Sequence, residues 1–323
     1  MNKLDKLLWL LAAMVMLQSS VQAQSYPARP VTLIVSTGSG TSPDRIGRLV
    51  ADRLAKELGQ SFVVENQAGG GGVIAPRNVA RAKPDGYTLL FGGVDTMVTN
   101  PYTVKDLGYD PNRDFDLVSM LYKEGSLAIA VHPSVPAKTL PELIALAKKE
   151  PGKISYGTSS INFIILFGQW ISKLGGVDML GVAYKSPAQQ FTDVLDGRIQ
   201  AIISSPPTMD AQMKAGKLRV LAVDGSQRFP LWPDVPLISE TFPGFRLSGT
   251  GILATPRGTP PEVIKVLYGA MEKITTDKAY QQALLQMGFT IDGPGTPDSI
   301  RALMRERADY WQKVFTGLNV KPE

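Results

Sequence analysis

The sequence STGSGTSPD, residues 36–44, lies between an apolar run, PVTLIV (30–35), and an amphipathic run, RIGRLVADRLAKELG (45–59). The apolar run predicts a buried strand, and the spacing of apolar residues in the second run predicts a helix. A strand-to-helix turn of this kind presents unpaired backbone N–H groups, which attract anions. The turn therefore suits an anion, or it only caps the helix through Ser42 or Asp44 with solvent above it.

The composition indicates a folded and mildly basic protein. The chain has 323 residues, of which 44% are hydrophobic, enough to bury a sizeable core and to form two domains. The formal charge is +5, from 34 basic and 29 acidic residues, without a long block of either sign. Because no nucleic-acid-binding motif accompanies this charge, we expect no nucleic-acid partner.

The first 23 residues have the features of a secretory signal peptide. Lys3 and Lys6 precede an apolar run, LLWLLAAMVML (7–17), that is too short to span a bilayer, and VQA (21–23) matches a cleavage site. We expect cleavage after Ala23 rather than an uncleaved membrane anchor. The chain has no cysteine, so it has neither a disulfide nor a lipid-modified cysteine. These features predict a protein that is free in the periplasm.

Strand-like and helix-like segments alternate along the rest of the chain. The further predicted strands are SFVVEN (61–66), TLLFGG (88–93), SLAIAVHP (126–133), KISYG (153–157), RIQAIISS (198–205) and LRVLAVDG (218–225). Predicted helices include LPELIALAKKEPG (140–152) and two polar helices that start near Pro261 and Thr296. This alternation predicts an α/β fold with mainly parallel sheets flanked by helices.

Cofactor and catalytic motifs are incomplete or absent from the sequence. Gly38 and Gly40 begin a dinucleotide-binding fingerprint and Glu65 supplies its acid, but Pro43 occupies the position of the last glycine. The sequence has no phosphate-binding loop and no G-x-S-x-G motif, and His132 is its only histidine. A carboxylate-only enzyme stays open, although no acidic pair stands out. We expect no cofactor, no metal and no enzyme, but a binding protein that holds a ligand between two domains.

Several blocks of the chain resemble the Bug-type solute receptors of tripartite tricarboxylate transporters. They are YPARPVTLIV (26–35), LAKELGQSFVVENQAGGGGVIA (54–75), VARAKPDGYTLL (79–90), HPSVPAKTLPELIALAKKEPGKISYG (132–157) and LATPRGTPPEVI (253–264). The resemblance covers nearly the whole mature chain. It implies a two-domain periplasmic-binding-protein-like fold with the ligand in the cleft. Residues 24–124 and 251–323 would form the first domain, and residues 125–250 the second.

The resemblance also implies the partners and the site. The partner would be a membrane permease of one small and one large subunit, and we expect the receptor to be a monomer without a membrane anchor. Two loops would close on a carboxylate through backbone N–H groups, hydroxyls and ordered water, without a neutralising arginine. The predicted binding residues of the first loop are Ser36, Thr37, Gly38, Ser39, Gly40 and Thr41. Those of the second loop, YGTSSINF (156–163), are Thr158, Ser159, Ser160, Asn162 and Phe163.

Two departures from the family's pattern bear on the ligand. Phe163 replaces a small residue and either forms an apolar wall of the cleft or points into the core beside Ile164. Ser204 and Ser205 stand where some relatives have an aspartate for a ligand ammonium, so an amino acid is a less favoured ligand. We expect Ser204 in the site and an aromatic mono- or dicarboxylate, such as a phthalate isomer, as ligand. Aliphatic di- or tricarboxylates are the alternative, as is a signalling partner in place of the permease.

Overall fold

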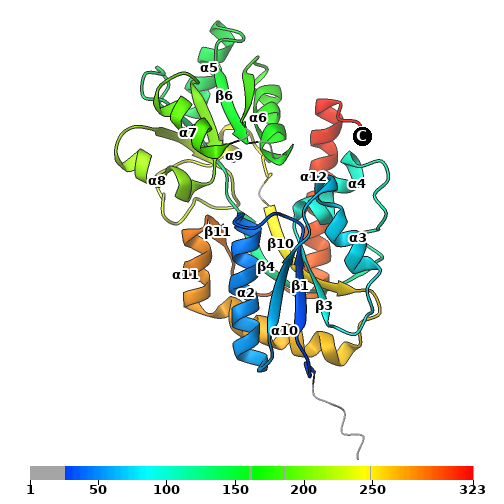
Figure 1. Ribbon diagram of the computed structural model, residues 1–323. Helices are drawn as coiled ribbons and strands as arrows, with labels where there is room; N and C mark the ends of the chain where they lie inside the picture. The colour runs from blue at the N-terminus through cyan, green and yellow to red at the C-terminus, as the bar shows by residue number, and fades with distance from the viewer. Residues whose placement is uncertain (1–25, 160–161, 185, 248, 323) are drawn as a thin grey trace, which may run out of the picture.

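Two sheets organise the chain. The computed structural model describes residues 26–159, 162–184, 186–247 and 249–322, so the expected signal peptide (1–23) and Ser160 lie outside the described residues. The larger sheet has six strands in the order β11-β4-β10-β3-β1-β2, and the smaller has five in the order β7-β6-β8-β5-β9. Figure 1 shows the two sheets in two halves of an elongated molecule, each with helices on its faces. The expected α/β fold class is thereby confirmed.

The six-stranded sheet draws on both ends of the chain. Its strands are β1 (Val31–Val35), β2 (Phe62–Asn66), β3 (Thr88–Gly92), β4 (Phe115–Gly125), β10 (Gly249–Pro256) and β11 (Phe289–Thr290). One face packs against α2 (Ser42–Leu58), α10 (Pro261–Thr276) and α11 (Lys278–Gln286). The other packs against α3 (Ile74–Ala80) and α12 (Pro297–Leu318). Because helices cover both faces, the central strands are apolar throughout rather than alternating, as the run PVTLIV indicates.

The five-stranded sheet is formed by the middle of the chain. Its strands are β5 (Ala128–Val131), β6 (Ser155–Ser159), β7 (Leu180–Tyr184), β8 (Ala201–Ser204) and β9 (Arg219–Val223). Its helices are α5 (Leu140–Lys149), α6 (Asn162–Gly175), α7 (Pro187–Leu195), α8 (Pro206–Lys214) and α9 (Ile238–Thr241). The strands of the two sheets thus come from separate parts of the chain, while the exact domain boundaries given above stay a prediction.

The expectation of mainly parallel sheets is wrong in one respect. β1 pairs in parallel with β2 and β3, and β6 with β7 and β8. However, β10 is antiparallel to β3 and β4, β11 is antiparallel to β4, and β5 is antiparallel to β8 and β9. For β4 and β10 the physical reason is that the chain leaves the larger sheet along β4 and returns along β10, so these long strands run in opposite directions and pair side by side.

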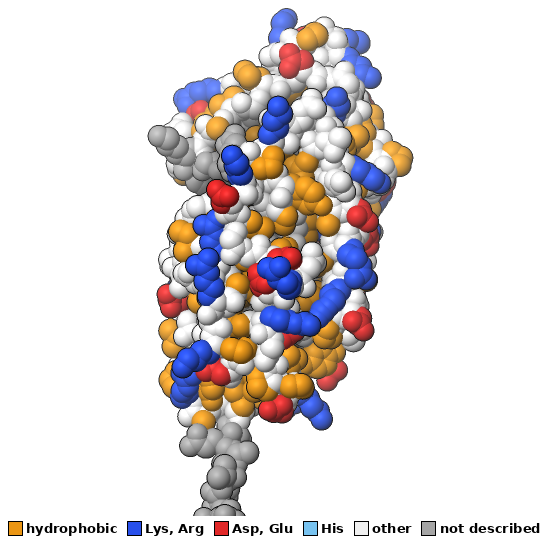
Figure 2. All heavy atoms as spheres, turned by 90° about the vertical axis from the view of Figure 1, so that its right-hand side faces the viewer, with side chains coloured by type: hydrophobic (Ala, Val, Ile, Leu, Met, Phe, Trp, Pro, Cys, Tyr) orange, Lys and Arg blue, Asp and Glu red, His pale blue; other side chains and the backbone are white. Residues whose placement is uncertain are grey.

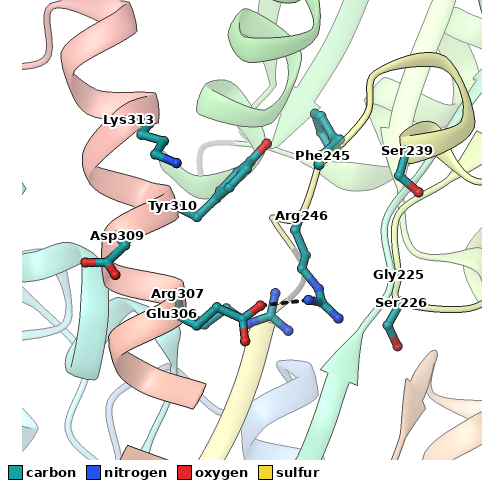
Figure 3. Close-up of a pocket in the computed structure, with 11 residues that line it drawn as sticks. Gly225, Ser226, Ser239, Phe245, Arg246, Glu306, Arg307, Asp309, Tyr310 and Lys313 are labelled. Atoms are coloured by element: carbon teal, nitrogen blue, oxygen red, sulfur yellow. Dashed lines mark hydrogen bonds and ion pairs between the residues drawn. The ribbon is translucent and has the colours of Figure 1, made fainter. Parts of the chain in front are cut away.

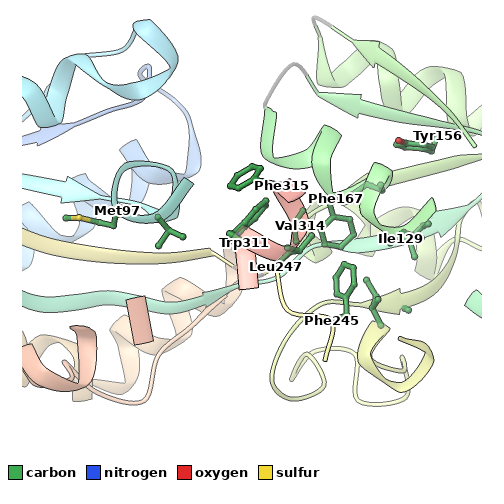
Figure 4. Packing of buried hydrophobic residues seen from close by; sticks show 14 of the residues in the cluster. Met97, Ile129, Tyr156, Phe167, Phe245, Leu247, Trp311, Val314 and Phe315 are labelled. Carbon is green, nitrogen blue, oxygen red and sulfur yellow. The ribbon is translucent and has the colours of Figure 1, made fainter. Parts of the chain in front are cut away.

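Helix α12 packs between the two halves. Trp311, Val314 and Phe315 on this helix belong to one buried cluster with residues of both halves, including Met97 and Tyr156 (Figure 4). The helix also touches α6 of the smaller half, where the indole Nε1 of Trp170 donates a hydrogen bond of 3.1 Å to the hydroxyl of Tyr310. The ring of Trp170 lies so close to Gly317 that a Cβ there would stand 2.6 Å away. The C-terminal helix therefore holds the two halves together.

The surface carries charges of both signs. Figure 2 shows basic and acidic side chains interspersed from end to end on one face of the molecule. Many of them form exposed ion pairs, such as Arg29 with Asp85 at 3.1 Å and Lys273 with Glu57 at 3.1 Å. Over the part of the chain that the structure describes, none of the helices has the length and hydropathy needed to cross a bilayer.

Three buried charged residues lie where the chain passes between the halves. Glu124 at the end of β4 accepts a hydrogen bond from the backbone N–H of Ser226 at 3.0 Å, and its Oε1 lies 3.8 Å from Arg307 of α12. Asp224, after β9, accepts a hydrogen bond from the backbone N–H of Leu247 at 3.2 Å. Burial raises the pKa of Asp224 to about 7, because Arg307 only partly offsets the lost solvation and the charge of Glu124.

Replacing Asp224 by asparagine is expected to change how stability depends on pH. Between its unfolded pKa near 4 and its folded pKa of about 7, Asp224 keeps a proton in the folded state that it releases on unfolding. Its contribution to the free energy of unfolding therefore falls as pH rises through this window. Relative to the wild type, the free energy of unfolding of Asp224→Asn should rise by about 1–3 kcal/mol between pH 4.5 and pH 7.5. Denaturant titration at each pH measures this difference.

The exposed Asp292 provides the control for this experiment. Its side chain is 67% exposed and pairs with Lys123 at the surface. Asp292→Asn should follow the wild-type pH profile to within about 0.5 kcal/mol. If the pH profile of Asp224→Asn is also parallel to that of the wild type, Asp224 is ionised in the folded protein at pH 4.5. Its surroundings, Glu124 and Arg307, would then be arranged differently.

Candidate ligand-binding site

The turn between β1 and α2 is partly closed by its own hydrogen bonds. Thr41 is the N-cap of α2, and its Oγ1 accepts a hydrogen bond from the backbone N–H of Asp44 at 3.4 Å. The same hydroxyl donates to the carbonyl of Gly38 at 2.8 Å and lies 2.8 Å from Oγ1 of Thr37. The cap is therefore neither Ser42 nor Asp44, and the Thr41 hydroxyl is committed to holding the turn.

The carboxylate of Asp44 holds the turn in place through hydrogen bonds. It is buried and accepts hydrogen bonds from the backbone N–H of Gly40 at 2.8 Å and from Nδ2 of Asn66 at 2.9 Å. That amide also donates to the carbonyl of Thr37 at 3.0 Å, and Arg48 pairs with Asp44 at 2.9 Å. Burial alone would raise the pKa of Asp44, but these hydrogen bonds outweigh it and hold the pKa below its usual value. Asp44 is thus a charged positioning residue.

The upper side of the turn keeps free donors. The backbone N–H groups of Thr37, Gly38 and Ser39 have no hydrogen-bond partner among the described residues. Ser36 is buried, whereas Ser39, Gly40 and Thr41 are exposed. Gly40 has φ of +82°, which favours glycine, while a Cβ on Gly38 would meet no atom within 4 Å. The turn therefore presents preorganised donors next to open space.

Two further loops reach the same edge of the sheet. In the parallel register, Val35 lies opposite Asn66 of β2 and Phe91 of β3. The loops after these strands, Gly69–Gly72 and 93–95, therefore lie beside the turn. All four glycines of Gly69–Gly72 have positive φ, between 58° and 128°. Figure 1 shows that the end of β1 and the start of α2 point towards the half with the smaller sheet.

Asp95, the first residue of the short π-helix η2 (Asp95–Thr99) after β3, is a candidate site residue that the sequence predictions do not include. Its Oδ1 accepts a hydrogen bond from the backbone N–H of Thr96 at 2.8 Å, and a Cβ on Gly72 would stand 3.4 Å from its Oδ2. Burial raises the pKa of this carboxyl group. A signal was available in the sequence, because an acid soon follows Gly92 and Gly93 at the end of a predicted strand.

The second predicted loop is also a strand-to-helix turn. β6 ends at Ser159, α6 begins at Asn162, and Thr158 is buried. Ser160 lies outside the described residues, and so do the side chains of Ser159, Asn162 and Phe163. Whether Phe163 faces the cleft or the core therefore stays a prediction.

Ser204 lies at the end of a strand next to β6. Its Oγ is 2.8 Å from Oγ1 of Thr208, which donates to the carbonyl of Ser205 at 2.7 Å. These hydroxyls bind one another and a carbonyl group, and no side chain caps the start of α8, whose N-cap residue is Ser205. The start of α8 also meets the larger half, since a Cβ on Gly288 would stand 3.0 Å from Pro207.

A separate cavity of about 440 Å³ lies between α12 and the segment 225–246 (Figure 3). Arg246 and Glu306 form an ion pair of 2.7 Å across it, and Tyr310 and Lys313 line its α12 side. None of the predicted binding residues lines this cavity. The β1–α2 turn, with its free donors and the predicted binding residues, is therefore the better candidate site.

Removing the carboxylate of Asp44 is expected to loosen the β1–α2 turn. In Asp44→Ala the N–H of Gly40, the amide of Asn66 and the guanidinium of Arg48 lose their acceptor. We expect the free energy of unfolding to fall by about 1–3 kcal/mol and amide hydrogen exchange in residues 36–44 to accelerate. Mass-spectrometric hydrogen exchange and thermal unfolding measure the two effects.

The control variant lies on the same helix. Glu57 forms an exposed ion pair with Lys273, so Glu57→Ala should change stability by less than about 0.5 kcal/mol and leave exchange in the turn unchanged. Equal exchange rates in Asp44→Ala and the wild type would show that the turn holds its shape without Asp44.

The chain is similar to proteins of known sequence and structure. A UPF0065 protein from Bordetella bronchiseptica is 36% identical over 318 residues, which cover 97% of this chain and 93% of that protein. A solved structure described as R. palustris Rpa4515 with adipate is 30% identical, with a TM-score of 0.79 over 92% of this chain and 100% of that one. MatC (Rpa3494) from Rhodopseudomonas palustris with bound malate is 26% identical, with a TM-score of 0.72 over 90% of this chain and 99% of that one.

A family model settles the relationship. The model of the tripartite tricarboxylate transporter family receptor, TctC, matches residues 46–319. The resemblance read from the sequence is thereby confirmed, together with the fold and the expectation of a solute-binding receptor rather than an enzyme. The chain belongs to the TctC family of tripartite tricarboxylate transporter receptors.

Proposed function

We propose that this protein is a periplasmic receptor that captures a small organic carboxylate between its two halves and delivers it to a membrane permease. The free backbone N–H groups of Thr37, Gly38 and Ser39 carry this proposal, because they are oriented donors at a helix start. The adipate and malate of the two similar structures are carboxylates and support the same ligand class. Periplasmic location follows from the family and from the expected signal peptide.

For the ligand itself we propose an aromatic mono- or dicarboxylate. The support is Phe163, which stands in the second loop where the family has a small residue, and an aromatic wall favours a ring by about 0.5–1.5 kcal/mol beyond burial. Aliphatic di- or tricarboxylates are the alternative, and the ligands of the similar structures, adipate and malate, favour that alternative. The alternative to the permease is a signalling partner that recognises the ligand-bound receptor.

Ligand-induced thermal stabilisation tests the proposed function. The mature chain is purified through unfolding and refolding to remove any bound ligand, and its Tm is measured with benzoate, phthalate, terephthalate, succinate, adipate, malate and citrate. A ligand at a hundred times its Kd adds about 2.7 kcal/mol to the free energy of unfolding, so Tm rises by several degrees. A response to aromatic acids alone supports the aromatic ligand, and one to aliphatic acids alone overturns it. If none of the acids raises Tm, the receptor proposal is overturned.

Adding a methyl group at Gly38 is expected to weaken binding without unfolding the protein. The Cβ of Gly38→Ala would stand in open space beside the free N–H groups, at a position without positive φ. We expect the Kd of the responding acid to rise about tenfold or more, which corresponds to about 1.4 kcal/mol, while Tm without ligand stays the same. Isothermal titration calorimetry measures the change.

Gly269 provides the matched glycine-to-alanine control. A Cβ there also meets no atom within 4 Å, but Gly269 lies in α10, at the end of the molecule away from the smaller sheet (Figure 1). Gly269→Ala should keep the wild-type Kd. Wild-type affinity in Gly38→Ala as well would place the ligand away from the β1–α2 turn.

A further inference from the structure

We propose that Asp95 determines specificity in this site, and that the carboxylate ligand carries a second group, an ammonium or a hydroxyl, that donates a hydrogen bond to Asp95. This inference rests on the proposed function and deepens it, because it adds a second chemical requirement to the ligand. The β1–α2 turn would hold the carboxylate, and Asp95 would hold the donor.

Asp95 is in the right place for this role. It begins η2 just after β3, whose end lies beside the end of β1 in the parallel register, so residues 93–95 border the turn at residues 36–41. The glycine loop after β2 covers its other side, with Gly72 close to Oδ2. The side chain is neither fully buried nor fully exposed. A ligand held at the free N–H groups would therefore have this carboxylate as a neighbour.

The hydrogen bonds of Asp95 are incomplete. Oδ1 accepts from the backbone N–H of Thr96 at 2.8 Å and from its hydroxyl at 3.4 Å. The carboxyl group also accepts a hydrogen bond from the backbone N–H of Asp95 itself. Among the described residues, only Asp95 and Thr96 donate to it, and no lysine or arginine forms an ion pair with it. The nearby ionisable groups are the phenols of Tyr109 and Tyr122, each with a pKa raised by burial and by this charge. The carboxylate thus receives hydrogen bonds only from residues 95 and 96 and has no positively charged partner among the described residues, so a donor on the ligand can supply one.

A purely structural role does not account for the charge. The hydrogen bonds at Oδ1 need only an acceptor, which the amide oxygen of asparagine supplies in the same shape. An unpaired carboxylate in a poorly solvated place costs free energy, and this cost shows in the raised pKa. Such uncompensated charges concentrate at functional sites, where a ligand supplies the missing partner.

Asp95 also reverses one argument made from the sequence. Ser204 and Ser205 lack the acid that would bind a ligand ammonium, and an amino acid is therefore less favoured on that ground alone. Asp95 supplies a carboxylate from the opposite half, on the edge that carries the free N–H groups. Donor and acceptor groups on one edge suit a ligand of mixed polarity better than a ligand with two carboxylates.

Matched pairs of ligands test this inference. Adipate and 6-aminohexanoate have similar lengths but differ at one end, as do terephthalate and 4-(aminomethyl)benzoate, and in each pair an ammonium replaces one carboxylate. Succinate with malate, and benzoate with 4-hydroxybenzoate, test a hydroxyl donor in the same way. The Kd of each compound is measured by calorimetry at neutral pH on the refolded wild type, on Asp95→Asn and on Asp234→Asn. Asp234 is exposed on the other half and serves as control.

We expect the wild type to prefer the donor-bearing ligand of a pair and Asp95→Asn to lose this preference. The wild type should bind the donor-bearing member of at least one pair about tenfold or more tightly. Asp95→Asn should lose this preference and bind the matching dicarboxylate or unsubstituted acid at least as tightly as the wild type does, because a repelling charge is gone. A gain in affinity cannot come from a misfolded variant. Asp234→Asn should behave as the wild type.

Two other outcomes overturn the inference in different ways. If dicarboxylates bind the wild type as tightly as their donor-bearing partners, and Asp95→Asn changes no Kd, Asp95 has no part in specificity while the receptor function stands. If no compound binds any of the three proteins, the proposed function fails and the inference fails with it.

Discussion

The double passage of the chain between the two sheets is the constraint on which the site depends. β4 and β10 run side by side in the larger sheet and continue into the smaller half, so both passages leave from one edge. Buried Glu124 and Asp224 bind backbone N–H groups there, and Arg307 brings α12 to the same place. Because these contacts fix one edge of each half, the end of β1 and the start of α2 are held towards the half with the smaller sheet (Figure 1).

The sequence predicts the β1–α2 unit better than it predicts β4 and β10, the strands along which the chain passes between the halves. The β1–α2 unit is recognisable because a fully apolar run, a turn of small residues and an amphipathic run follow one another within 30–59. β4 and β10 are not among the predicted strands, since an alternation of strand and helix does not reveal strands that leave one sheet for the other. The antiparallel pairs of the larger sheet all involve β4 or β10, and for that reason the parallel expectation fails there. In the smaller sheet the antiparallel pairs belong to β5, which follows β4 in the chain.

The candidate site shows the same division. Residues 36–41 are predicted as a group, but the sequence does not tell which of their donors are used internally. Thr41 caps the helix and Gly40 binds Asp44, so the donors left for a ligand belong to Thr37, Gly38 and Ser39. The glycines before Asp95 mark the end of a strand, but the sequence does not show that Asp95 lies beside the turn. That depends on the register of β1 and β3, which brings together two segments that are more than 50 residues apart in the sequence.

The charge balance beneath the turn explains how it can hold an anion without a dedicated cation. Arg48 is close enough to attract a carboxylate, but it pairs with Asp44, and the two charges largely cancel. What remains is the field of the helix start and the free N–H groups, whose directions select an oxygen with lone pairs in a particular place. Such an arrangement favours recognition by geometry over strong charge attraction. A receptor must also release its ligand, and a cradle of dipoles binds less tightly than a buried arginine would while keeping that selectivity.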